Sequence, residues 1–143
     1  MVKYITAAQT LPLRSLVLRN GLELEKCVFP TDYNEDGFHL GFFTGSEITS
    51  IATFFWEDYP EEPVDGVRLR GMATHPDYAG QGQGAAIINF AVSELSSQNA
   101  SYIWCNARKG AVGFYEKLGF LIASDEFEIV GIGPHFNMIK TLI

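Results

Sequence analysis

Apolar residues recur along the chain with two different periods, which predict both strands and helices. Short runs rich in β-branched and aromatic residues predict strands, and apolar residues three or four positions apart predict helices. Seven segments have the strand pattern: residues 2–6, 38–43, 47–56, 67–74, 102–105, 120–127 and 131–141. The short polar sequence Thr44-Gly45-Ser46 separates the second strand from the third, which predicts a hairpin.

Three segments have the helical pattern. The first helix is predicted to begin at a Thr10 cap and to end at Asn20-Gly21. The second follows a glycine-rich loop directly, and its apolar face is formed by Ala85, Ile87, Ile88, Ala91, Val92 and Leu95. The third covers roughly residues 109–118 and ends at Gly119.

The order of these elements is strand, helix, three strands, helix, strand, helix and two strands. The alternation of strands and helices at the centre implies parallel neighbours, whereas the flanking hairpins imply antiparallel ones. The predicted fold class is therefore α/β, with a central mixed β-sheet flanked by helices on both faces. The length fits a single domain over residues 1–143.

The loop at residues 79–86 reads A-G-Q-G-Q-G-A-A and carries the strongest chemical signal in the chain. Glycine lets the backbone approach a ligand closely and adopt dihedral angles that other residues avoid. The first N–H groups of a helix have no partner within it, and the helix dipole adds partial positive charge there. The loop therefore predicts a socket for a phosphate or pyrophosphate, and the alternative is a tight turn that only starts the helix.

Two common phosphate-binding motifs do not fit this loop. A dinucleotide-binding loop follows the first strand and has an acidic residue about 20 positions later. Here the loop lies past mid-chain, and residues 101–105 contain no acidic residue. The phosphate loop of nucleotide hydrolases ends in Gly-Lys-Ser or Gly-Lys-Thr, whereas this loop ends in Gly-Ala-Ala.

Composition and charge narrow the function classes. The net charge is −7 and the ten Lys and Arg residues are scattered, which argues against nucleic acid as a partner. An acidic surface suits a cationic substrate or serves solubility alone. No apolar run approaches the roughly 20 residues that span a bilayer, and the first residues lack a signal-peptide core. Cys27, Cys105 and three dispersed histidines have no metal-ligand spacing, so we expect no metal. Without a membrane span or a signal peptide, we also expect no membrane partner and a cytoplasmic location.

Three segments occur in the order and at the separation typical of one known family. The strand L-R-G-M-A-T-H-P-D-Y, the loop A-G-Q-G-Q-G-A and the later helix A-V-G-F-Y-E-K-L-G-F resemble the GCN5-related N-acetyltransferase (GNAT) superfamily over residues 68–120. The resemblance implies the acyl-CoA N-acyltransferase fold and the use of acetyl-CoA. It also implies an enzyme that acetylates a primary amine of a small molecule, by direct attack of the amine in a ternary complex.

The resemblance assigns roles in binding acetyl-CoA to particular residues. In that family the loop binds the pyrophosphate through backbone N–H groups, here those of Gly80, Gln81, Gly82, Gln83, Gly84 and Ala85. The preceding strand splays from its neighbour, and its free backbone groups pair with the pantetheine arm, here at Met72, Ala73 and Thr74. Two positions depart from the family pattern: Ala79 replaces an Arg or Gln, and Arg108 replaces an Asn for which nearby Asn106 is a candidate substitute.

Tyr115 resembles the family's frequent general acid, which protonates the departing CoA thiolate. The alternative is an aromatic residue that packs beside a buried helix face formed by Phe114 and Leu118. A general base must also take a proton from the attacking ammonium, directly or through water. Five side chains are candidates for it: Glu57, Asp58, His39, His75 and His135.

Two other interpretations of the whole chain stay open at this point. The departure at Ala79 favours a non-catalytic acyl-CoA-binding module that senses rather than transfers. The other is a structural domain without a ligand. The sequence does not name the acceptor amine, and it leaves room for a homodimer that pairs through the apolar C-terminal strand.

Overall fold

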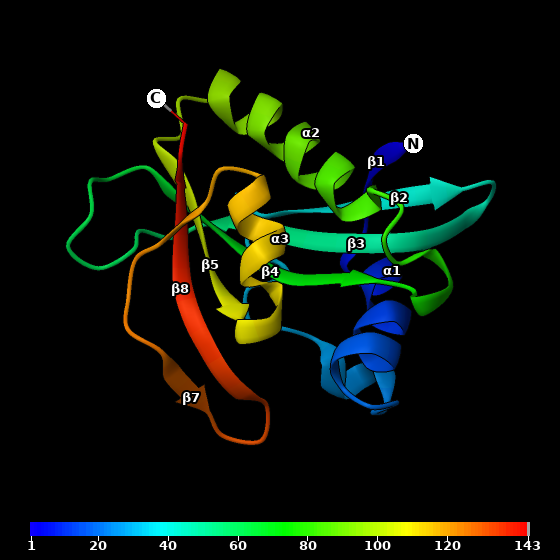
Figure 1. Ribbon diagram of the computed structural model, residues 1–143. Helices are drawn as coiled ribbons and strands as arrows, with labels where there is room; N and C mark the ends of the chain where they lie inside the picture. Colours follow the sequence, from blue (N-terminus) through cyan, green and yellow to red (C-terminus); the bar gives the residue numbers. More distant parts are fainter. Residues whose placement is uncertain (143) are drawn as a thin grey trace.

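A computed structural model describes residues 1–142, which form one eight-stranded sheet with helices on both faces (Figure 1). The strand order is β1-β2-β3-β4-β5-β8-β6, and β7 also pairs with β8. All strand pairs are antiparallel except β4 with β5, which confirms the predicted mixed sheet. The strands are β1 (Val2–Ile5), β2 (Phe38–Thr44), β3 (Glu47–Trp56), β4 (Gly66–Thr74), β5 (Tyr102–Arg108), β6 (Leu121–Ile122), β7 (Phe127–Ile129) and β8 (Gly133–Thr141).

The helices cover the two faces of the sheet unequally. They are α1 (Ala7–Leu13), α2 (Gln83–Ser97) and α3 (Val112–Lys117). The main core lies under α2 and α3, where Leu40 and Phe54 from alternate strand positions pack with Ile87. On the opposite face, Leu13 of α1 packs with Ile51. In Figure 1, α2 lies above β3 and β4, and α1 lies below them. Within the described residues, no helix has the length and apolar character needed to cross a membrane.

The first helix does not begin where the sequence pattern places it. Its N-cap is Thr6, not Thr10, because Thr6 and Gln9 form a complete capping box that satisfies two backbone N–H groups. Thr10 is buried inside the helix, and its hydroxyl donates to the Ala7 carbonyl. Pro12 has no N–H to donate, and the chain continues past it as a π-helical segment, Arg14–Leu18.

The predicted strand at residues 120–127 is wrong as a single element. Phe120 is buried in the core, and only the short strands β6 and β7 pair with β8. Between them, Ala123 still donates to the Asn137 carbonyl, but the backbone N–H of Asn137 donates to the Ser124 hydroxyl, so a side chain replaces one bond of the ladder at this point. As a result β8 is paired with β5 along one edge and with β6 and β7 along the other. β6 and β7 thus cover much of the β8 edge through which the predicted homodimer would pair, and the homodimer itself stays a prediction.

The parallel strands β4 and β5 diverge, as the family resemblance implied. Their register runs only from Gly66–Tyr102 to Arg68–Trp104. In Figure 1, β4 then continues to the right and β5 turns downward. A bulge bends β4 beyond this point, where Gly71 has a φ of +67°. An added Cβ at Gly71 would also lie 2.9 Å from the Phe29 ring, so only glycine fits this position without strain.

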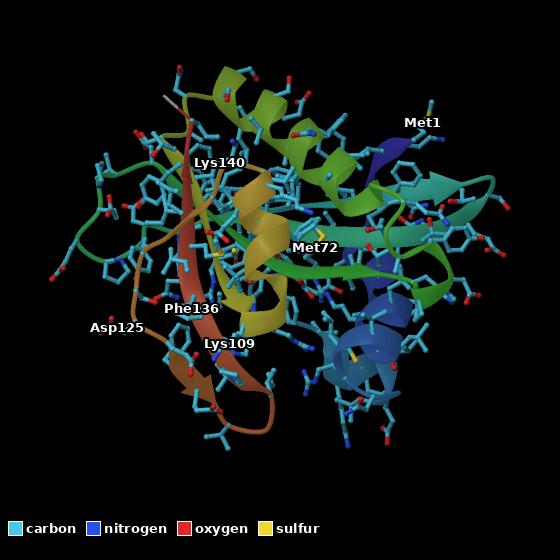
Figure 2. The ribbon with its side chains drawn as sticks, in the orientation of Figure 1. Met1, Met72, Lys109, Asp125, Phe136 and Lys140 are labelled. Carbon is cyan, nitrogen blue, oxygen red and sulfur yellow. The ribbon has the colours of Figure 1, made fainter. Side chains whose placement is uncertain are left out.

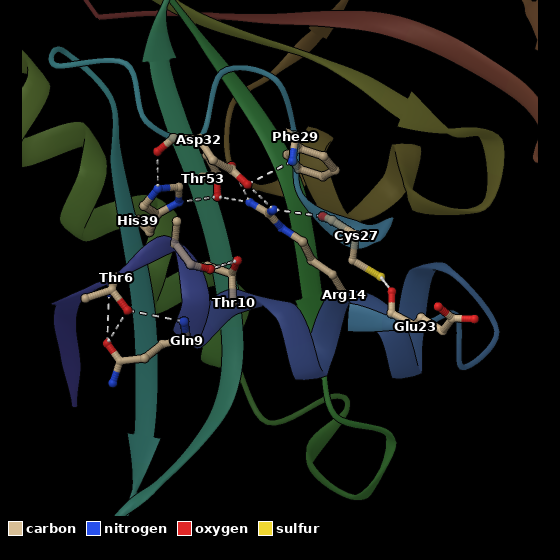
Figure 3. A network of polar contacts seen from close by, with 11 residues as sticks. Thr6, Gln9, Thr10, Arg14, Glu23, Cys27, Phe29, Asp32, His39 and Thr53 are labelled. Carbon is tan, nitrogen blue, oxygen red and sulfur yellow. Dashed lines mark hydrogen bonds and ion pairs between the residues drawn. The ribbon is translucent and has the colours of Figure 1, made fainter. Parts of the chain in front are cut away.

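A buried ion pair joins α1 and the turn-rich segment to the sheet (Figure 3). Arg14 donates to both carboxylate oxygens of Asp32, at 2.6 and 2.9 Å, and to the Thr53 hydroxyl at 2.8 Å. The His39 ring contacts the same hydroxyl at 2.8 Å and the Asp32 carbonyl at 3.0 Å. Burial alone would raise the pKa of Asp32, but the hydrogen bonds from Arg14 and from the Phe29 amide hold that pKa below its usual value.

We expect Asp32→Asn to lower the free energy of unfolding by about 3–5 kcal/mol, because it leaves the Arg14 guanidinium buried without a counter-charge. The matched control is Glu126→Gln, which removes a carboxylate paired with Lys109 at the surface and should change stability little. Urea unfolding of both variants at neutral pH measures the difference. Equal effects of the two substitutions would contradict a structural role for the buried pair.

The lowered pKa of Asp32 also predicts how the stability of the protein depends on pH. The folded-state pKa of Asp32 is lowered, so its contribution is complete above the ordinary carboxyl pKa and is lost as the pH falls through the folded-state value. The difference in unfolding free energy between wild type and Asp32→Asn should therefore narrow in acid. A difference that stays constant as the pH falls would show that the carboxylate charge is not its cause.

Candidate active site

A cavity of about 720 Å³ opens where β4 and β5 diverge. The loop before α2 and helix α3 form one wall, and the segment after α1 contributes to another. The cavity brings together every binding or catalytic residue assigned from the sequence except Gln81: Met72, Ala73, Thr74, Gly80, Gly82, Gln83, Gly84, Ala85, Asn106, Arg108 and Tyr115. The edge of β4 that carries Met72, Ala73 and Thr74 has no β5 partner.

The glycine-rich loop presents a row of free backbone donors. None of the six N–H groups of residues 80–85 has a hydrogen-bond acceptor within residues 1–142. The neighbouring amides do have acceptors, since Ala79 donates to Pro76 at 3.3 Å and Ala86 to Gly82 at 3.0 Å. Gly82 is the N-cap of α2 with a φ of +80°, so the row runs directly into the first turn of a fifteen-residue helix. Free donors and the helix dipole together make this an anion site.

Two side-chain features hold this loop in place. The buried amide of Gln83 accepts from the Thr49 hydroxyl at 2.7 Å, which ties the loop to the β2–β3 hairpin. A Cβ at Gly84 would lie 3.1 Å from the Phe114 ring, so glycine allows α2 and α3 to pack closely. Figure 2 shows Met72 beside α3, near the first turn of α2. The glycine-rich motif predicted only a backbone role for Gln83, and it gave no signal for this anchoring side chain.

Tyr115, rather than Phe114, is the buried residue of α3, so the predicted buried face of this helix is wrong. Tyr115 is 6% exposed, packs edge-on against Phe120 and reaches the cavity. Burial, and then the nearby Cys105 thiol, raises the pKa of Tyr115 well above its ordinary value. The phenol therefore keeps its proton near neutral pH and is a proton donor. Burial also raises the pKa of Cys105 to about 12, so this thiol is not a nucleophile.

Of the five candidate bases, only His135 lines the cavity. It lies in β8, and its buried ring stacks with Phe127. Its Nδ1 is 2.7 Å from the Gly133 carbonyl, which can only accept, so Nδ1 carries the proton. In the neutral ring this leaves Nε2 as the acceptor, the form that a base requires.

The other four candidates do not line the cavity, and each has a structural partner. Glu57 pairs with Arg68 at 3.1 Å, and Asp58 accepts the Gly66 amide at 2.8 Å. His39 uses both ring nitrogens in the Arg14–Asp32 network, and burial lowers its pKa. His75 accepts the amide of Asp77 at 3.1 Å, which caps the turn before the loop. Within residues 1–142, no three His, Cys, Asp or Glu side chains lie together in a group that could hold a metal ion.

The cavity also includes side chains that the sequence analysis did not select. Phe29, Arg68 and Arg70 line it. Arg68 and Arg70 are two positions apart in a strand next to the loop, which places them on one face and was an available signal. Phe29 gave no signal, because its position depends on how the turn-rich segment folds.

A family model and a curated relative both match this chain, and both are described as acetyltransferases. A family model described as an acetyltransferase (GNAT) domain matches residues 35–142. The uncharacterized N-acetyltransferase YitI of Bacillus subtilis (strain 168) is 38% identical over 142 residues, which cover 99% of this chain and 95% of YitI.

Solved structures share the fold at lower identity. An aminoglycoside 6′-N-acetyltransferase complexed with coenzyme A matches with a TM-score of 0.74 and 15% identity, over 100% of this chain and 97% of that one. The ribosomal-protein-S18-alanine N-acetyltransferase from Escherichia coli matches with a TM-score of 0.77 and 18% identity, over 99% and 94%. These structures establish the fold, and the family model and YitI establish the family. The chain therefore belongs to the GNAT family of acetyltransferases.

Proposed function

We propose that this protein transfers the acetyl group of acetyl-CoA to a primary amine of a small molecule, by direct attack in a ternary complex. The observation that carries the proposal is the cavity between β4 and β5, which joins the free amides of residues 80–85 to the buried Tyr115. Membership of an acetyltransferase family favours transfer over a non-catalytic acyl-CoA-binding module or a domain without a ligand.

In this proposal, acetyl-CoA binds mainly through backbone groups. The pyrophosphate lies against the amides of residues 80–85, and the pantetheine arm extends along the free edge of β4 at Met72, Ala73 and Thr74. Asn106 and Arg108 approach from β5, and the Asn106 side chain is held by the Asn137 amide at 2.6 Å. Ala79 offers no long side chain, but the socket consists of N–H groups and does not need one.

The proposed chemistry assigns one proton to each of two side chains. His135 accepts a proton from the ammonium through Nε2, directly or through water. The freed amine attacks the thioester carbonyl, and as the carbon–sulfur bond breaks, its electron pair leaves on sulfur. Tyr115 donates a proton to that thiolate, and the second proton of the attacking nitrogen, released as the amide forms, returns to Tyr115 directly or through water.

The size of the site supports a small acceptor. The two solved neighbours are named for different acceptors, one an aminoglycoside and the other a ribosomal protein, so the shared fold does not choose between them. The concave cavity of about 720 Å³ is in the range of small-molecule sites and includes the proposed CoA site, so an acceptor has only part of this volume. A single domain over residues 1–143, a cytoplasmic location and a homodimer stay predictions from the sequence.

Gly82→Asp and Gly82→Asn test the phosphate socket as a matched pair. Both residues tolerate the positive φ at this position, and they differ by one charge. The Asp variant should bind acetyl-CoA at least about tenfold more weakly than the Asn variant, because its carboxylate would face the pyrophosphate. Added salt should reduce the difference. Calorimetry gives both dissociation constants, and equal values would exclude this loop as the phosphate site.

Tyr115→Phe keeps the ring packing and removes only the proton donor. The rate of acetyl transfer in a single turnover should fall about 10- to 100-fold, near the lower end of general-acid effects, because a thiolate is a good leaving group. The Kd for acetyl-CoA should stay close to that of wild type. Reduced stability with an unchanged transfer rate would leave Tyr115 a packing residue only.

His135→Gln should slow transfer at neutral pH by about 10²-fold, since the acceptor ammonium then lacks a base. The difference in rate between wild type and His135→Gln should shrink as the pH rises, because the acceptor ammonium then loses its proton to solvent without a base from the protein. His75→Asn is the control: it lies outside the cavity, and Asn can still accept the Asp77 amide. A deficit that is constant across the pH range would contradict the role of His135 as the base.

A further inference from the structure

The charged side chains around the cavity are all of one sign. The chain has a net charge of −7, yet none of its 17 Asp and Glu residues, all within the described part of the chain, lines the cavity. Six of its ten Lys and Arg residues do: Arg14, Arg19, Arg68, Arg70, Arg108 and Lys117. The lining sets the local potential, so the overall acidity of the chain does not extend to this site.

Binding of CoA phosphates accounts for only part of this charge. The phosphate socket lies at the start of α2, on the α2–α3 face of the sheet. Leu69 of β4 packs into the core on that face, so its neighbours Arg68 and Arg70 point to the opposite one. Arg70 accordingly reaches Phe29, with its guanidinium carbon 4.1 Å from the ring centroid. This wall is separate from the socket, because it lies on the face of the sheet opposite α2 and α3.

Arg70 differs from its neighbours because it forms no direct ion pair, although Asp32 and Glu57 lie near enough to oppose part of the shift in its pKa. Arg14 pairs with Asp32 at 2.6 Å, and Arg68 pairs with Glu57 at 3.1 Å. None of the ion pairs formed within residues 1–142 involves Arg70. Burial, with Arg68 and Arg14 close by, lowers the pKa of Arg70, which shows that its charge lies in an unfavourable environment. An anion bound beside Arg70 would stabilise its charge.

A second donor on the same wall lacks a partner. Arg14 is fully buried and lines the cavity, and its Nε has no hydrogen-bond acceptor within residues 1–142. Its guanidinium carbon lies 3.7 Å from the centroid of the same Phe29 ring (Figure 3). An added Cβ at Gly71 would lie 3.4 Å from this Nε, and glycine has no side-chain acceptor to offer it. The wall therefore holds a free guanidinium and a buried free N–H at one aromatic ring.

We infer that Arg70, oriented by Phe29, binds a carboxylate of the acceptor, so the substrates are small amines that carry a carboxylate. A guanidinium presents two parallel N–H donors that match the two oxygens of a carboxylate. With the carboxylate held on the β4 wall, the amine is directed across β5 toward His135 on β8. The inference rests on the proposed acetyl transfer and specifies its acceptor.

The test uses acceptors that differ only at the carboxylate: L-amino acids of each side-chain class, their carboxamides, and spermidine as a cationic amine. Wild type should have a kcat/KM at least about tenfold higher for a preferred amino acid than for its amide. Arg70→Met keeps apolar contact with Phe29 and should lower kcat/KM for the acid about 10- to 100-fold, with the amide and the Kd for acetyl-CoA unchanged. Arg70→Lys should keep only part of the preference, because Lys has the charge without the fork.

Arg19→Met is the matched control, because it removes the same charge from an exposed position at the cavity. An equal loss in this variant would assign the effect to the general field of the cavity and overturn the role of Arg70. A preference for the amides or for spermidine would also overturn it, as would equal losses for acid and amide in Arg70→Met.

Calorimetry with CoA-bound protein separates this inference from the proposed function. Binding of an amino acid that is lost in Arg70→Met supports the carboxylate site even if no transfer follows. Absence of binding by every amino acid overturns it. A normal Kd for acetyl-CoA in the same variant shows that the cofactor socket is intact.

Discussion

The early separation of β4 and β5 is the constraint on which the rest of the site depends. Two parallel strands stop pairing after Arg68 and Trp104, and the remaining edge of β4 is left without a strand inside the molecule. Backbone N–H and C=O groups need partners, so an edge of this kind favours an extended ligand. The bulge at Gly71 bends β4 away from β5, and the loop before α2 begins five residues past Thr74, the last residue of β4, at Ala79. The binding groups therefore lie along the gap between the diverging strands β4 and β5.

The two faces of the sheet provide different environments on either side of the gap between β4 and β5. On the α2–α3 face, an apolar core surrounds Tyr115 and raises the pKa of its phenol, so a neutral donor is kept out of bulk water. On the α1 face, the walls are polar and basic. In the proposed reaction, the leaving thiolate lies near the buried Tyr115 phenol, and the acceptor lies near the arginines and the Nε2 of His135.

The buried Arg14–Asp32 pair connects stability to the basic wall. A buried ion pair is costly to desolvate, and an apolar replacement often stabilises a protein as well or better. Here Asp32 also accepts the Phe29 amide at 2.8 Å, and the Phe29 ring lies against both Arg14 and Arg70. The pair therefore fixes the aromatic ring that orients the cavity arginine. We regard this positioning as the reason for a charged pair where an apolar contact would suffice for folding.

The sequence by itself determined the features that depend on neighbouring residues. The order of strands and helices follows from local apolar periods, and the glycine loop follows from the dihedral angles and free N–H groups of one short segment. Tyr115 was selected through its motif, although its burial was assigned to Phe114 instead. Even local rules left ambiguity where two residues compete, as Thr6 and Thr10 do for one cap.

Only the tertiary structure decided which distant side chains meet. One of five candidate bases reaches the cavity, because β8 lies next to β5 in the sheet although residues 109–132 separate them in the chain. Phe29 and Arg70 come together through the fold of a turn-rich segment and a bulge in a strand. The strand predicted at residues 120–127 was broken by a side chain that bonds to residue 137. These outcomes depend on contacts between segments far apart in the chain, and the periodicity of a single segment carries no information about such contacts.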